Sequence, residues 1–331
     1  MKAKSSGIGG QAVLEGIMMR NRNRYSVAVR KPDQEIEVIV KKHVGLDKKI
    51  KILKLPLLRG VFTFIDSMVI GMQTLNLSAE YYEDPQEQAP KTADKVGRTI
   101  FKDKLDTLVM AGTFIVSLAL ALLLFMYLPF YLSRLLSKFV VSTIWLNVFE
   151  GIIRLGIFLT YVTLISMMKD IKRLYMYHGA EHKCINCIES GLELNIKNVR
   201  QSTRYHKRCG TSFMLFVMVV SIVVFMFIHA EDAVTQMLYR IALIPLVAGI
   251  SYEFIRYAGN HNNLFATILS APGKLLQMLT TREPDDEMIE VGIAAIEAVF
   301  DWRAYRSIED DPEGAFEFID EDEDGILDDV Q

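Results

Sequence analysis

The sequence is poor in cysteine and histidine, with three cysteines and six histidines among 331 residues. An odd set of three cysteines cannot pair fully within one chain, so we expect free thiols or ligands and not a disulfide framework. The N-terminus lacks an uninterrupted apolar run with a small-residue cleavage site, so we expect no secretory signal peptide. The net charge of −3 is uninformative by itself, because basic and acidic residues concentrate in different parts of the chain.

Apolar residues, in contrast, are abundant. Hydrophobic residues make up 51% of the chain, 16 residues are methionine, and the mean hydropathy is +0.22. These values indicate a membrane protein with soluble parts. Four segments are long and apolar enough to cross the roughly 30 Å hydrocarbon core of a bilayer as helices, namely residues 108–132, 146–168, 211–229 and 237–258.

The distribution of lysine and arginine predicts the orientation of these spans. The chain carries 19 such residues before residue 107, two in 133–145, nine in 169–210, none in 230–237 and four after 258. Basic residues concentrate on the cytoplasmic side of membrane proteins. We therefore expect a multi-pass protein of the bacterial cytoplasmic (inner) membrane, with both termini and the 169–210 loop in the cytoplasm.

A fifth apolar stretch at 52–79 is interrupted by Pro56, Arg59, Gly60 and Asp66. These interruptions favour a helix that lies in the interface or re-enters the bilayer over a fifth span. A soluble amphipathic core helix is the alternative.

Upstream of that stretch, apolar and polar residues alternate on both sides of residues 31–34 (Lys-Pro-Asp-Gln), which predicts a β-hairpin. The predicted fold is therefore an α-helical polytopic membrane protein with about four transmembrane helices, an interfacial or re-entrant helix and a small cytoplasmic N-terminal region containing a β-hairpin. In chain order, the predicted divisions are the N-terminal region (1–51), the interfacial or re-entrant helix (52–79), a linker (80–107), a first transmembrane hairpin (108–168), a cytoplasmic His/Cys loop (169–210), a second hairpin (211–258), a cytoplasmic C-terminal region (259–308) and an acidic disordered tail (309–331).

The stretch YHGAEHKCINC, at 177–187, holds two of the six histidines and two of the three cysteines. His178 and His182 are four residues apart, so a helix through them places both side chains on one face, where they can share a metal ion. With Glu181 they form the H-x-x-E-H order of inverted zinc peptidases. In that order the glutamate is a base that acts on metal-bound water and is not a ligand.

Further donor residues stand at both ends of the 169–210 segment and allow two arrangements around a divalent metal, with zinc favoured. In a structural site, Cys184, Cys187, His206 and Cys209 would close a tetrahedron. In a catalytic site, His178 and His182 would bind the metal with one of His206, Glu189 or Cys209, and one coordination position would stay open. A third possibility is that no metal binds.

Charged residues inside predicted spans are costly and are usually functional or paired. Glu253 and Arg256 lie near the cytoplasmic end of the last span, so Glu253 is a candidate ligand, or else the two form an i,i+3 ion pair. Glu150 and Arg154, near the outer end of the second span, are predicted to be such a pair. Near the N-terminus, a run of polar side chains could dock on the catalytic segment or meet anionic lipid headgroups, and its members are Gln11, Glu15, Arg20, Arg22 and Arg24.

Five ordered blocks of this sequence resemble the YqhQ-like bacterial membrane family of unknown function, whose members are often labelled metal-dependent enzymes. The blocks are GGQAVLEGIMMR (9–20), YHGAEHKCINCIE (177–189), HKRCGTSF (206–213), AGISYEFIR (248–256) and TTREPDDEMIEVGIAA (280–295). The resemblance excludes Cys184 and Cys187 from the motif and favours His178, His182, His206 and Cys209 as donors. The motif residues that it implies are Gln11, Glu15, Gly16, Arg20, His178, Glu181, His182, Glu189, His206, Cys209, Gly210, Glu253, Arg282, Glu283 and Glu290.

The sequence therefore favours a membrane-embedded, metal-dependent hydrolase with a cytoplasm-facing site that acts on a membrane lipid or a membrane-protein segment. Glu181 would be the general base, and Arg20, Arg256 or Arg282 would stabilise negative charge. The main alternative is a non-enzymatic scaffold or biogenesis factor with a structural metal site, whose basic face contacts ribosome, nucleic acid or anionic lipid. A transporter is a weaker alternative, and a homo-oligomer could supply the solute path that four spans lack.

Overall fold

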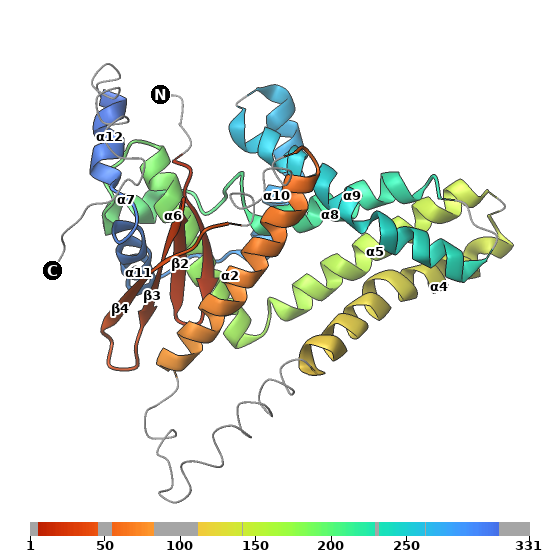
Figure 1. Ribbon diagram of the computed structural model, residues 1–331, viewed down its shortest axis with the longest axis horizontal. Helices are drawn as coiled ribbons and strands as arrows, with labels where there is room; N and C mark the ends of the chain where they lie inside the picture. The colour runs from red at the N-terminus through yellow and green to blue at the C-terminus, as the bar shows by residue number, and fades with distance from the viewer. Residues whose placement is uncertain are drawn as a thin grey trace, which may run out of the picture.

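The computed structural model of the protein describes residues 6–45, 55–82, 112–140, 142–228, 232–261 and 263–310. Most of the predicted linker and of the predicted acidic tail lies outside these residues. A small sheet with its covering helices occupies one end of the molecule, and a bundle of long apolar helices extends away from it (Figure 1).

The N-terminal region forms a four-stranded antiparallel sheet in the order β1-β2-β3-β4. Its strands are β1 (Gly9–Val13), β2 (Gly16–Asn21), β3 (Arg24–Arg30) and β4 (Ile36–Lys42). The predicted hairpin is confirmed as β3 and β4, which pair from Arg24↔Lys42 to Arg30↔Ile36. Strands β1 and β2 were not expected, because glycines at positions 9, 10 and 16 interrupt their apolar residues and hide the alternation that marks a strand.

Different helices bury the two faces of the sheet. On one face, apolar side chains pack with Ile70 of α2 (Leu58–Tyr82), and they are Val13, Met18, Tyr25, Val27 and Val29. The other face is covered by α6 (Lys169–Glu189) and α11 (Asp286–Glu297), with α7 (Ile196–Gln201) and α12 (Trp302–Asp310) beside them. The sheet is therefore the middle layer of three.

Helix α2 confirms a helix within the predicted 52–79 stretch, beginning at Leu58. It contacts β1 and β3 on one side and α9 (Ala233–Asn260) on the other, so it lies where the sheet meets the bundle (Figure 1). Seven large apolar side chains of α2 remain 39% to 53% exposed, and five of them recur at helical spacing as a stripe, namely Ile65, Met68, Val69, Met72 and Leu75. No described segment covers this stripe.

The bundle consists of the helical segment Gly112–Lys138, which includes η2 (Leu123–Tyr127), α4 (Leu128–Leu135) and η3 (Leu136–Lys138), together with α5 (Thr143–Ile165), α8 (Gly210–Phe225), α9 and α10 (Leu264–Thr280). Three of these helices are long and apolar enough to cross a membrane, and they are residues 112–138, 143–165 and 234–260. The helix in the remaining predicted span, α8, is apolar but has 16 residues. These helices indicate a membrane protein.

The segment expected to be a loop at 169–210 is mostly helical. Helix α5 ends at Ile165, a turn follows, and Met168 adopts an extended conformation before α6 begins. The H-x-x-E-H residues therefore lie on a separate 21-residue helix that packs on the sheet, not on an extension of a bundle helix.

A polar network lies inside the bundle. Glu150 forms ion pairs with both Arg154 and Arg240, and all three side chains are at most 6% exposed. Arg240 also donates to Oδ1 of Asn147 at 3.0 Å, and Gln236 donates to the same oxygen at 3.1 Å. The predicted Glu150–Arg154 pair is present, but it is part of a larger network that joins α5 to α9.

Candidate metal centre

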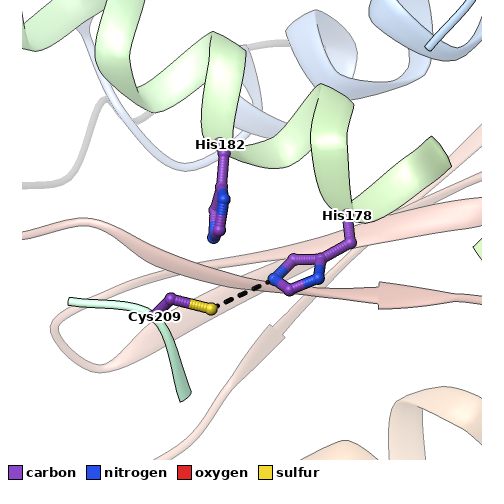
Figure 2. Close-up of side chains that lie close together, drawn as sticks. All are labelled: His178, His182 and Cys209. Atoms are coloured by element: carbon purple, nitrogen blue, oxygen red, sulfur yellow. Dashed lines mark hydrogen bonds between the residues drawn. The ribbon is translucent and has the colours of Figure 1, made fainter. Parts of the chain in front are cut away.

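The side chains of His178, His182 and Cys209 converge at one point (Figure 2). The two histidines are one turn apart on α6, with their ring centroids 4.4 Å apart. Cys209 stands at the N-cap of α8, and its Sγ lies 3.3 Å from Nε2 of His178. One ligand atom from each residue lies within 4.8 Å of the others, which is close enough for all three to bind one ion.

Backbone carbonyls fix the orientation of both imidazole rings. Nδ1 of His178 donates to the carbonyl oxygen of Thr280 at 2.8 Å, and Nδ1 of His182 donates to that of Arg204 at 2.6 Å. Because Nδ1 carries the proton in the neutral form of each ring, Nε2 is the nitrogen that can bind a metal or a second proton. Histidines that bind metals are usually held by a second hydrogen bond of this kind.

Gly179 explains how a carbonyl can reach His178. A methyl group on Gly179 would collide with the carbonyl oxygen of Arg282, so only glycine allows residues 280–284 to lie against α6. The N–H of Arg282 donates to the carbonyl of Tyr175 at 2.8 Å and holds this segment in place. Gly179 lowers the helix propensity of α6, but it permits the contact that orients His178.

The electrostatics favour a thiolate at Cys209. Burial raises the pKa of this thiol, but His178 and His182 outweigh that effect and hold the pKa well below its usual value of 9.0. Burial likewise lowers the pKa of His178, but the charges of Cys209 and Glu181 raise it to about 9. Thiolate is the form of cysteine that binds metals.

A cavity of about 260 Å³ opens onto the three side chains. Glu181 lines it, is 5% exposed, and has its Oε2 atom 3.9 Å from Nε2 of His178. The first residues of the sheet form a wall of the cavity, and a methyl group on Gly10 would lie 2.8 Å from Cγ of Glu181. Glu181 is therefore held beside the cluster without belonging to the group of three.

Two further predicted ligands, His206 and Glu189, lie near the cluster but outside the group of three. His206 lines the cavity, and its ring centroid is 5.6 Å from that of His182. Glu189 accepts hydrogen bonds from the N–H and hydroxyl of Ser6, each at 2.8 Å, and forms an ion pair with Arg208. Burial raises the pKa of Glu189, but His206 and Arg208 lower it to about 2. This carboxylate joins the N-terminal segment to the end of α6.

The remaining predicted site residues lie elsewhere. Glu253 forms an ion pair with Arg59 of α2 and does not line the cavity. Arg256 is exposed on α9, so the predicted i,i+3 pair with Glu253 is replaced by this pairing between helices. Arg20 donates to Asp66 at 2.9 Å and lines a neighbouring cavity.

Cys184 and Cys187 are buried in the core beneath the sheet and are not near Cys209. On a helix with 100° per residue, they point away from the face that carries His178 and His182. The structural arrangement with four Cys/His ligands is therefore not formed among the described residues.

Sequence reasoning missed three features of the site. Arg208 and the glycine-rich segment Gly7–Gly10 line the cavity, and the carbonyls of Thr280 and Arg204 orient the histidines. The cluster of glycines was the available signal for the wall of the cavity. A carbonyl carries no side-chain signature, so the contacts of the Thr280 and Arg204 carbonyls had no signal in the sequence.

The described residues thus define a class of protein: a helical membrane protein with a sheet-supported His/His/Cys cluster. A family model described as "Protein of unknown function (DUF1385)" matches residues 55–302, and the chain belongs to this family. The "Uncharacterized protein YqhQ" of Bacillus subtilis (strain 168) is 34% identical over 291 residues, which cover 86% of this chain and 89% of that protein. No solved structure matches the chain. These matches confirm the resemblance and name no reaction.

Proposed function

We propose that this protein is a membrane-bound, metal-dependent hydrolase whose metal is bound by His178, His182 and Cys209. The observation that carries the proposal is the convergence of two carbonyl-oriented imidazoles on one buried thiol. A cysteine nucleophile would need only one histidine as its base. The second oriented histidine adds nothing to such a pair, but it is the third ligand that a metal requires.

The donor set fits zinc. Catalytic zinc sites use three protein ligands and keep one position open, and both histidine and cysteine are common among them. The cavity beside the cluster provides space for that open position. A divalent ion there would polarise a carbonyl or phosphoryl group and lower the pKa of water.

The surrounding residues supply the rest of the chemistry. Glu181 is placed to accept a proton from water at the cluster, because its carboxylate lies on the cavity wall beside His178. Arg208, which forms an ion pair with Glu189, lines the same cavity, so its guanidinium is the candidate to stabilise developing negative charge. Arg208 would take the role predicted for Arg20, Arg256 or Arg282.

We propose a cytoplasm-facing location for this site at the surface of the bacterial cytoplasmic (inner) membrane. The bundle helices would cross as two hairpins, with α8 and the apolar residues after it forming the fourth span. Sixteen helical residues cover about 24 Å, so a few more residues are needed to match the hydrocarbon core. The lysine and arginine distribution supports a cytoplasmic location for both termini. The substrate would be a membrane lipid or a membrane-protein segment.

Metal analysis of purified variants tests the proposal. We expect about one zinc ion per wild-type chain, and the same content in Glu181→Gln. Cys209→Ala should lose most of the metal, whereas the matched control Cys187→Ala should keep it, because Cys187 lies in the core. Elemental mass spectrometry measures these contents, and absence of stoichiometric metal from the wild type would overturn the proposal.

Catalysis is tested with the same variants in nanodiscs of bacterial phospholipid extract. Glu181→Gln should lower the rate of product formation by about 10²–10⁴-fold while the fold is retained. Mass spectrometry of the lipids measures the products. Two results would contradict the hydrolase: Glu181→Gln forms product at the wild-type rate, or the wild type forms no product. If metal removal also unfolds the protein, the scaffold with a structural metal site is the better description.

A further inference from the structure

A second cavity, of about 370 Å³, adjoins the first. The two cavities share Gly7, Gly9 and Gly10 in their linings, so this segment forms a common wall. The rest of the second lining comes from β1, from β2 with the turn that follows it, and from α2. Among the residues that the structure describes, the lining includes two arginines and no carboxylate.

The two arginines, Arg20 and Arg22, differ in how they are held. Arg20 is fixed by its ion pair with Asp66, and its side chain is 26% exposed. Arg22 is exposed at the turn between β2 and β3, and it has no ion-pair or hydrogen-bond partner among the described residues. One positioned guanidinium and one unpaired guanidinium at the same cavity are suited to bind an anion, and phosphate above all.

The other part of the lining is apolar and continues onto the surface. Met18 and Ile70 line the cavity, together with Ser67 of α2. Met68 follows Ser67 directly, and the exposed apolar stripe of α2 continues from it through Met72 to Leu75. Within the described residues, a cationic cavity therefore opens beside an uncovered apolar helix face.

We propose that this cavity binds the phosphate headgroup of an anionic glycerophospholipid whose acyl chains lie along the exposed face of α2. A small soluble anion would use the arginines but not the apolar stripe, whereas a lipid uses both. The bound headgroup would be separated from the His/His/Cys cluster only by the shared segment Gly7–Gly10, so this lipid is also a candidate substrate. That second step rests on the proposed function. The binding site itself does not depend on the metal.

Lipid titrations of the purified full chain in detergent test this site. The probes are dihexanoyl-phosphatidylglycerol, dihexanoyl-phosphatidylcholine and inorganic phosphate, and native mass spectrometry counts the bound lipid. We expect Arg22→Gln to weaken phosphatidylglycerol binding about tenfold, as loss of a charged hydrogen bond does. The matched control, Arg24→Gln, removes the same charge from the opposite face of the sheet. Arg24 lies on the same face of β3 as Ser26 and Arg30, and both of these contact α11. It should bind like the wild type.

A second variant, Met68→Gln, tests the apolar half and should weaken binding about fivefold. The proposal is overturned if phosphatidylcholine binds as tightly as phosphatidylglycerol, if inorganic phosphate competes at equal concentration, or if Arg22→Gln and Arg24→Gln behave alike. The same titration after metal chelation should give unchanged affinity. A protein that binds the lipid but contains no metal would refute the proposed hydrolase and leave this site standing.

Discussion

At the scale of single residues, the site depends on contacts that only small or charged groups can make. Gly179 admits the backbone of Arg282 against α6, and the adjacent Thr280 carbonyl then orients His178. Gly10 similarly leaves room for Glu181. These glycines are required by close approach and not by unusual backbone angles, because neither is among the glycines with positive φ.

Asp66 provides a pH-dependent prediction at this scale. Burial raises the pKa of Asp66, but hydrogen bonds from His43 and Arg20 outweigh burial and hold the pKa below its ordinary value of 3.8. The ionised form therefore stabilises the fold at pH values above about 4, and this stabilisation disappears as the pH falls below that value. We expect Asp66→Asn to lower the free energy of unfolding by about 1–3 kcal/mol at pH 7.

Melting temperatures of the wild type and Asp66→Asn, recorded between pH 7 and pH 3, check this prediction. The difference between the two proteins should shrink as the pH falls. A difference that stays constant over this range would show that the ionisation of Asp66 does not contribute.

At the scale of elements, the break between α5 and α6 directs the histidines to the sheet. Because α6 packs on β1 and α11, its buried side carries Cys184 and Cys187 into the core, and its other side faces the returning chain at Cys209. The site is thus formed where a sheet-packed helix meets the start of a bundle helix.

The network of Glu150, Arg154 and Arg240 joins two elements of the bundle and gives a second prediction. Glu150→Leu leaves two buried arginines without their counter-charge, so it should lower the free energy of unfolding by about 3–5 kcal/mol. Adding Arg240→Leu should recover part of that loss, because it removes one of the unpaired cations. Thermal unfolding in detergent measures the cycle, and strictly additive effects would argue against the coupling.

At the scale of the whole molecule, the proposed topology places the His/His/Cys cluster and the anion cavity on one side of the membrane. Alkaline phosphatase, which is active only outside the cytoplasm, reports on this directly. In a bacterial host, fusions joined after Lys138 or Asp232 should be active, and a fusion joined after Ser202 should be inactive. An active fusion after Ser202 would reverse the assignment of the cytoplasmic face.

Much of the fold could be predicted from the sequence because it follows from local periodicity. Apolar runs of sufficient length indicated the bundle helices, and alternation indicated β3 and β4. The spacing of His178 and His182 placed them on one helix face for the same reason. Only β3 and β4 of the four strands were predicted, because glycines interrupt the apolar–polar alternation in β1 and β2.

The sequence by itself determined that this is a membrane protein of the DUF1385 family and that two histidines and a glutamate stand at a spacing that one helix face can bring together. Only the tertiary structure grouped Cys209, and not His206 or Glu189, with His178 and His182, buried Cys184 and Cys187 in the core, and paired Glu253 with Arg59. Periodicity within a segment is a local property. The meeting of residues 31 positions or more apart depends on how helices and sheet pack, which no spacing along the chain encodes.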